Sequence, residues 1–244
     1  MVVLSVGAYY VADLRRLQDM LAAREGQAAL QGVTDPAQID DALRQHPQNK
    51  FLQMMAMATR AADEADAAVE KLSNEIEPPA KSKDINLGAA SRNDLEALRR
   101  DLKAAEARAT TFMPRYAAVL KTERDDVEKY ALSVHLGKDA VSRFLDNIDQ
   151  RHAEITAFTS RMLPARADFY RAYENYVAVL AGEFGSYKVV DGQFMFPFQR
   201  TVDRYNVAAR AMTAATKRVA ELEEERKSLR KSQQERWLQF VNGK

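Results

Sequence analysis

The stretch FLQMMAMATRAADEADAAVEKLSNEI, residues 51–76, decides the fold class of this chain. Its apolar residues recur in alternating steps of four and three, at Phe51, Met55, Ala58, Ala62, Ala65, Val69, Leu72 and Ile76. This spacing places one apolar stripe along a helix and is typical of helices that pack against each other in bundles. It predicts a helix from about Gln48 to Ile76, whose small central residues allow a neighbouring helix to approach closely.

Three longer segments show the same spacing. In residues 91–136 the stripe is Leu95, Leu98, Leu102, Ala105, Ala109, Phe112, Tyr116 and Val119. In residues 138–183 it is Val141, Leu145, Ile148, His152, Ile155, Phe158, Met162, Phe169, Tyr173, Tyr176 and Leu180. In residues 198–240 it is Val202, Tyr205, Ala209, Met212, Val219, Leu222, Leu229 and Trp237. We therefore expect an all-α fold, an elongated antiparallel helical bundle with coiled-coil-like seams.

Capping and proline signals set the expected boundaries of the remaining elements. A first helix is expected from near Val2 to Leu30, and a short helix at residues 35–46 with Thr34 or Asp35 as its cap. Residues 77–91 read as a loop, because two consecutive prolines stop the helix before it.

Ser91 and Asp94 form the expected capping box of the next helix. Proline lacks the N–H group that an interior helical hydrogen bond requires. Pro114 should therefore bend this helix, and Pro164 should kink the one after it.

The segment YKVVDGQFMFPFQRTVDRYN, residues 187–206, interrupts the helical pattern. Two short β-prone runs flank Asp191-Gly192, a strong signal for a two-residue hairpin turn, so a hairpin is predicted at residues 186–197, between the last two helices. A lone hairpin is marginally stable in water and must pack on something. The inward face would be formed by Tyr187, Val189, Phe194 and Phe196. We expect a structural cap on the bundle, with a dedicated recognition or insertion tongue as the alternative.

Composition excludes several functions. The chain has 244 residues, expected to form one domain over residues 1–244, with 36 Lys and Arg against 35 Asp and Glu. Such a balance lacks the basic footprint of a nucleic-acid-binding protein, so no nucleic-acid partner is expected. There is no cysteine, which excludes disulfides and thiolate metal sites.

The first twelve residues, MVVLSVGAYYVA, carry no charge. A membrane-spanning helix needs ~20 apolar residues, so this run is too short on its own. It is either the remnant of a membrane anchor that begins before Met1 or the apolar start of a bundle helix. Arg15 and Arg16 weigh mildly against translocation of the residues after the run.

Residues 187–206, together with the helix before them, resemble an uncharacterised family of enterobacterial envelope lipoproteins. The features that carry the resemblance are Gly192, Phe196-Pro197 and Tyr205-Asn206, all in the C-terminal third. This chain departs from the family in having no cysteine for lipid attachment, so any anchoring would use the N-terminal apolar run. The resemblance implies an envelope location and a fold, without an activity.

Groups that could carry chemistry are sparse. The three histidines, His46, His135 and His152, lack helical metal-ligand spacing, and Asp149-x-x-His152 has no second copy of the kind that a di-iron bundle needs. Folding could still bring His152 beside a carboxylate from residues 91–136 or 198–240. We expect no catalysis, no bound metal and no cofactor.

Aromatic residues suggest the one candidate site for a ligand or partner: Phe169, Tyr173, Tyr176, Phe194, Phe196 and Tyr205. Core packing beside the hairpin is the alternative interpretation of this group.

The predicted function is that of a non-catalytic structural or protein-interaction bundle of the bacterial cell envelope. It would lie on the periplasmic side, with inner-membrane anchoring through residues 1–12, and would bind protein partners or a second copy of itself. A cytoplasmic location is the alternative. Two other functions stay open: an extracytoplasmic ligand-sensing bundle, and a membrane-remodelling or pore-forming helical protein.

Overall fold

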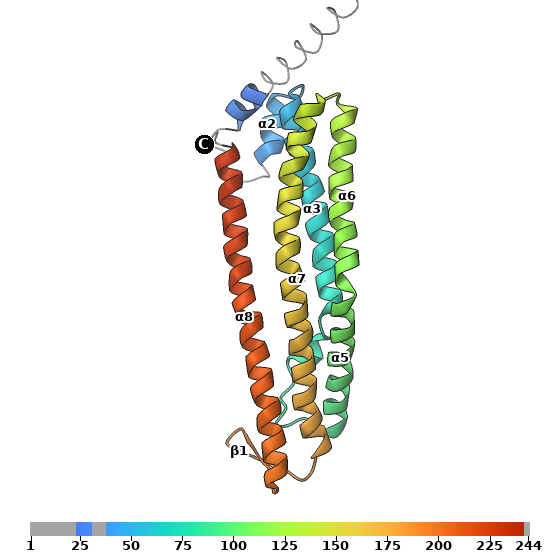
Figure 1. Ribbon diagram of the computed structural model, residues 1–244, viewed down its shortest axis with the longest axis vertical. Helices are drawn as coiled ribbons and strands as arrows, with labels where there is room; N and C mark the ends of the chain where they lie inside the picture. Colours follow the sequence, from blue (N-terminus) through green and yellow to red (C-terminus); the bar gives the residue numbers. More distant parts are fainter. Residues whose placement is uncertain (1–22, 31–37, 242–244) are drawn as a thin grey trace, which may run out of the picture. The chain divides into compact units, whose positions relative to one another are not determined.

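The computed structural model describes residues 23–30 and 38–241 (Figure 1). Helices account for 82% of these residues. Residues 23–29 are helical. The elements after them are α2 (Ile39–Gln45), α3 (Lys50–Ile76), α4 (Ala80–Lys83), α5 (Arg92–Thr110), α6 (Phe112–Ser133), α7 (Lys138–Gly182), β1 (Lys188–Val190), β2 (Gln193–Met195) and α8 (Gln199–Val241). The predicted all-α fold, with packed helices and one hairpin between the last two, is confirmed.

The chain forms two compact units. Unit 1 contains Met1–Val69, Ala117–Ile155 and Ser228–Lys244, and unit 2 contains Glu70–Tyr116 and Thr156–Lys227. Helices α3, α6, α7 and α8 each contribute residues to both units. The expectation of one domain over residues 1–244 stays a prediction.

In unit 1, α3, α6 and α7 run side by side (Figure 1). Their buried apolar cluster is Met54, Ala61, Val127, Ala131, Val141, Leu145 and Ile148. A second cluster joins residues 23–30, α2 and the beginning of α3, and consists of Leu30, Ile39, Ala42, Leu52, Met55 and Ala56. The beginning of α3 is therefore buried on more than the single stripe that its spacing predicts, because it packs against two groups of partners.

In unit 2, the core lies between α5, the second part of α7 and the beginning of α8. Its buried residues are Leu95, Leu98, Leu102, Ala105, Tyr170, Tyr176, Val177, Val179, Leu180, Ala181 and Ala208. The seam predicted for residues 91–116 is buried at every position from Leu95 to Tyr116. The hairpin and residues 85–90 cover one end of this core.

The single helix predicted for residues 91–136 is in fact two helices, so the expected bend at Pro114 is corrected to a break. Helix α5 ends at Thr110 and α6 begins at Phe112. Pro114 has no N–H to donate to the Thr110 carbonyl, and its ring crowds that carbonyl. The Thr111 N–H instead donates to the Arg108 carbonyl at 3.1 Å, so α5 ends about one turn before the proline. Helix α7, in contrast, continues through Pro164.

The expected loop at residues 77–91 contains the short helix α4, a second correction. Pro79 directly precedes this helix, where its missing N–H costs nothing. The Ser82 hydroxyl donates to the Asp101 carboxylate on α5 at 2.5 Å, which holds α4 against α5.

The capping box of α5 is confirmed. The Asp94 N–H donates to the Ser91 hydroxyl at 3.2 Å, and the Ser91 N–H donates to the Asp94 carboxylate at 3.0 Å. The predicted caps Thr34 and Asp35, and most of the predicted first helix, lie outside the described residues.

Candidate partner-binding surface

The hairpin turn has the geometry that its sequence predicts. Asp191 and Gly192 have φ of 50° and 76°, so both adopt the left-handed conformation that a two-residue hairpin turn favours. Strands β1 and β2 pair antiparallel, with Lys188 opposite Met195, Val189 opposite Phe194, and Val190 opposite Gln193. Because side chains alternate along a strand, this register defines two faces of the hairpin.

Three of the four residues expected on the inner face, Tyr187, Phe194 and Phe196, pack on the unit 2 core. Val189 shares this face by alternation but stays 39% exposed. The ring of Tyr187 lies 5.2 Å from that of Phe194 and 5.7 Å from that of Phe196, both in edge-on geometry. Such aromatic contacts add stability beyond the area that they bury. The predicted role of this face in packing is therefore supported by direct contacts.

Tyr205 of α8 links the inner face to α7. Its ring centroid lies 5.8 Å from that of Phe194, 5.1 Å from that of Phe196 and 5.3 Å from that of Tyr176. The hydroxyl groups of Tyr176 and Tyr205 are 2.9 Å apart and form a hydrogen bond. Burial raises the pKa of Tyr176, and the hydrogen bond with Tyr205 raises this pKa further.

Phe169 and Tyr173 form a second aromatic pair on α7, with ring centroids 5.9 Å apart, and both pack against the unit 2 core. Their neighbour Tyr170 is buried, and desolvation and the nearby Glu77 raise its pKa. The structure thus brings all six predicted residues to one core, where they contact each other and other core residues. Their role as a ligand or partner pocket stays a prediction.

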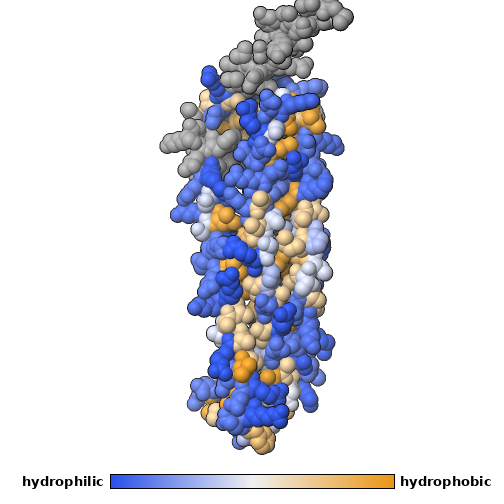
Figure 2. All heavy atoms as spheres, viewed as in Figure 1, coloured by the Kyte–Doolittle hydropathy of each residue, from blue (hydrophilic) through white to orange (hydrophobic). Residues whose placement is uncertain are grey.

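The outer face of the hairpin consists of Lys188, Val190, Gln193 and Met195, and it is exposed. Val190 keeps 51% of its surface exposed and Met195 keeps 56%. Six of the seven large apolar side chains that are prominently exposed in the described residues belong to unit 2. These six are Phe184, Val189, Val190, Met195, Phe198 and Val207. Figure 2 shows hydrophobic atoms at the surface where the hairpin and the beginning of α8 lie.

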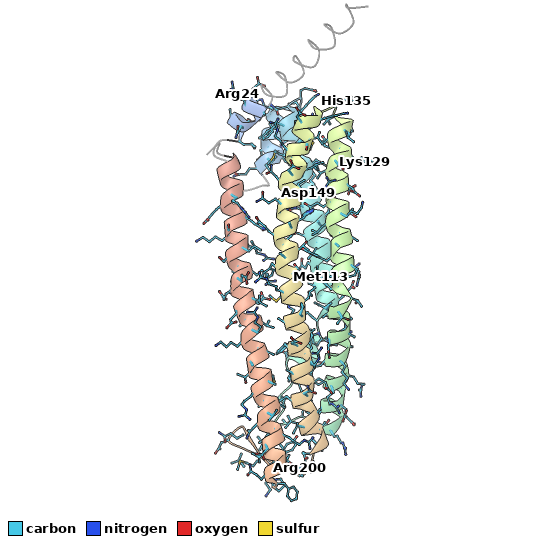
Figure 3. The ribbon with its side chains drawn as sticks, in the orientation of Figure 1. Arg24, Met113, Lys129, His135, Asp149 and Arg200 are labelled. Atoms are coloured by element: carbon cyan, nitrogen blue, oxygen red, sulfur yellow. The ribbon has the colours of Figure 1, made fainter. Side chains whose placement is uncertain are left out.

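Charges of both signs surround the outer face. Lys188 belongs to it, Asp191 is in the turn, and Arg200 lies at the beginning of α8, where Figure 3 labels it. Within the described residues, none of these three side chains takes part in an ion pair. Glu183, in contrast, forms one: its carboxylate oxygen lies 3.6 Å from the guanidinium of Arg204. Sequence reasoning chose the inner face as the candidate site and missed the outer one. The same alternation would have identified both.

Unit 1 holds a different cluster of functional groups, around the buried Glu123 of α6. The side chain of Glu123 is 3% exposed, and its carboxylate lies 2.9 Å from His152 Nε2 and pairs with Arg151, both on α7. Burial alone would raise the pKa of Glu123, but the hydrogen bond with His152 and the charge of Arg151 outweigh it, and the pKa is lowered. The expectation that folding could bring a carboxylate to His152 is confirmed.

Asp66 of α3 is at the exposed rim of this cluster. Desolvation raises its pKa, the charge of Arg151 opposes this rise, and the charge of Glu123 adds to it. In the described part of the chain, no group of three or more histidine and acidic side chains could hold a metal ion. The cluster consists of a buried carboxylate with Arg151 and His152 beside it.

Within residues 23–30 and 38–241, no helix is long and apolar enough to cross a membrane. The apolar run at residues 1–12 lies outside the described residues, so both interpretations of it stay predictions.

Comparison with known proteins gives no match. No family model fits the chain, and no curated protein or solved structure is significantly similar to it.

Proposed function

We propose that this chain is a non-catalytic protein-interaction bundle that binds a protein partner through the outer face of its hairpin and the apolar residues beside it. The observation that carries the proposal is the gathering of exposed apolar side chains in residues 184–207, outside a core that is already closed by aromatic contacts. Exposed apolar patches on soluble proteins commonly mark sites where another molecule binds.

The hairpin is suited to this role because its inner face holds it in place. Tyr187, Phe194 and Phe196 are fixed by ring contacts with each other and with α8, and the turn has the conformation that Asp-Gly favours. A surface that is ordered before binding loses less conformational entropy when a partner arrives. Val190 and Met195 are therefore exposed on a hairpin that is already ordered before a partner binds.

The proposal includes a location in the bacterial cell envelope, on the periplasmic side. Support comes from the uncharged run at residues 1–12 and from the family resemblance of residues 187–206. The ligand-sensing alternative has less support, because the aromatic residues on which it depends contact one another within the core.

Site-specific photocrosslinking in cells tests this function. A photoreactive residue at Met195 or Phe198 should capture a specific protein, because both side chains are exposed within the proposed surface. The matched control is Leu132 of unit 1, which is 62% exposed. In the described part of unit 1, no other large apolar side chain is prominently exposed, so Leu132 does not belong to a patch. Equal capture from all three positions, or capture from none, would contradict the proposal.

A further inference from the structure

We propose that the partner bound by the outer face of the hairpin is a second copy of this chain. The proposal rests on the proposed function, since it assigns an occupant to the same surface. Two copies would pack with their outer faces together, related by a two-fold axis that lies in the interface and runs perpendicular to the strands. Such an interface uses the same patch on both subunits and closes after two copies.

The register of the hairpin gives the expected contacts. Lys188 and Val190 of β1 are on the outer face, and Asp191 comes directly after them in the turn. Two residues of extended strand separate Lys188 from Val190 by ~7 Å, and Asp191 follows in the turn. The two-fold axis reverses the strand direction, so the aliphatic stem of Lys188 lies over Val190 of the other copy. The Lys188 ammonium then reaches Asp191 of that copy, and the same contact occurs a second time by symmetry.

The charges on the hairpin fit a second copy better than a partner whose surface carries charges of only one sign. Lys188 lies at one end of β1 and Asp191 just beyond the other, and within the described residues neither has an ion-pair partner. Arg200, at the beginning of α8, adds a second cation beside this face. An anionic membrane or an acidic protein surface would leave Asp191 without a cation, and a basic partner would leave Lys188 without an anion. An antiparallel second copy pairs Lys188 with Asp191 twice and covers the exposed Val190 and Met195.

The size of the surface sets the strength of the association. A standard stable interface buries ~800 Å² on each partner, which is more than four side chains of a short hairpin provide. Phe184 and Phe198 extend the apolar area at its rim, being 42% and 66% exposed. We therefore expect a weak dimer, with a dissociation constant on the order of 10–100 μM.

Sedimentation velocity of the full chain over a concentration series is the first test. The sedimentation coefficient should rise towards that of a dimer, and Met195→Glu should weaken the association more than tenfold because it buries a charge in the interface. Leu132→Glu, at an equally exposed apolar position of unit 1, should leave the association unchanged. Wild-type protein that stays monomeric up to several hundred micromolar would overturn the proposal.

A charge exchange provides the decisive test. Lys188→Glu places two anions together in the dimer, and Asp191→Lys places two cations together, so each variant alone should be monomeric. In an equimolar mixture of the two variants, both contacts join opposite charges, and the heterodimer should form with at least tenfold higher affinity than either homodimer. No other kind of partner predicts this recovery, and its absence would contradict the proposed geometry.

The turn conformation requires a folding control. Asp191 has φ of 50°, a conformation that asparagine tolerates better than lysine. Asp191→Asn keeps the turn while removing the charge, so it should weaken the homodimer without changing the circular dichroism spectrum. An unweakened dimer would argue against the contact between Lys188 and Asp191.

Three outcomes separate this inference from the function on which it rests. A monomeric chain that still captures a different protein from position 195 overturns self-association and leaves the interaction function standing. A monomeric chain that captures nothing contradicts both. A monomer that floats with vesicles containing anionic phosphatidylglycerol, and loses this binding in the Met195→Glu variant, would assign the surface to a membrane.

Discussion

Unit 1 and unit 2 bury their polar groups in different ways. Unit 1 places the carboxylate of Glu123 between a histidine and an arginine, at a position where the acid is almost completely buried. Unit 2 places neutral tyrosine hydroxyls in its core. The carboxylate that it buries, that of Glu174, lies 2.9 Å from the guanidinium of the partly exposed Arg99. A buried charge depends on every partner that compensates it, whereas an apolar core depends on volume. The two units should therefore fail under different changes.

The largest expected effect is on the apolar core of unit 2. Leu180 is fully buried, so Leu180→Ala leaves a cavity and should cost about 2–5 kcal/mol of unfolding free energy. Leu132→Ala removes the same atoms from a side chain that is 62% exposed and should cost under about 0.5 kcal/mol. Chemical denaturation measures both. Similar costs for the two variants would mean that unit 2 does not depend on packing at Leu180.

The next largest effect concerns the charge of unit 1. Glu123→Gln keeps the shape of the side chain but leaves Arg151 and His152 without their carboxylate, and should cost about 1–3 kcal/mol. Hydrogen exchange should rise in α6 and α7 of unit 1. Glu225→Gln, which removes an exposed partner of Arg161, is the control and should change little. A stabilised Glu123→Gln variant would show that desolvation outweighs the pairing.

The two units should also differ in their response to pH. The folded-state pKa of Glu123 lies below its ordinary value of 4.5, so its stabilisation is present above that value and is lost as the pH falls through the folded pKa. The folded-state pKa of Tyr176 lies above its ordinary value of 10.0, so its stabilisation is present below pH 10 and is lost as the pH rises further.

Hydrogen exchange measured by mass spectrometry across pH should show this difference. Unit 1 peptides should lose protection first in acid, and unit 2 peptides should lose it first in alkali. The Glu123→Gln variant should lack the acid-sensitive part of the unit 1 response. The reverse order in the wild-type protein would refute the assignment.

A smaller effect is expected from the tyrosine pair. Tyr205→Phe removes the hydrogen-bond partner of the buried Tyr176 hydroxyl while keeping the ring contacts, and should cost about 1 kcal/mol in thermal or chemical unfolding. Tyr173→Phe is the matched control, because burial alone raises the pKa of Tyr173. The control should change stability less than Tyr205→Phe does. Equal effects would mean that the pairing of the two hydroxyls contributes nothing.

The smallest difference should come from two glycines of unit 2. Gly192→Ala forces a side chain into a turn with φ of 76° and should cost about 1 kcal/mol. At Gly182, the last residue of α7, an added Cβ meets no atom within 4 Å. Gly182→Ala should therefore be neutral or stabilising by a few tenths of a kcal/mol. An unchanged melting temperature for Gly192→Ala would count against the constrained turn.

Local sequence signals are sufficient for much of this fold. Ser91 and Asp94 are three residues apart, and Asp191 and Gly192 are adjacent, so the capping box and the hairpin turn each depend on a few neighbouring residues. The break at Thr111 is harder to predict. Pro114 lies in the first turn of α6 and Pro164 lies inside α7, but the apolar spacing continues past each of them, so the sequence does not distinguish the two cases.

The charged cluster could only be predicted in outline. Glu123 and His152 are 29 residues apart on different helices, so spacing indicates that some carboxylate could approach but not which one. Each residue taken alone fits an ordinary helix surface or seam. The outer face of the hairpin was missed for another reason. The prediction selected aromatic residues, and in the hairpin these lie on the inner face because their large rings pack on the core.

The assignment of four helices to both units has a consequence for synthesis of the chain. Unit 2 ends at Lys227, and unit 1 takes its third segment from residues beyond it. A ribosome therefore completes every segment of unit 2 before it completes unit 1, although unit 1 contains the earlier residues. Helix α6 and the first part of α7 emerge while the α8 residues that belong with them have not been made. Until then, Glu154 cannot form its ion pair with Arg236, which is translated 82 residues later.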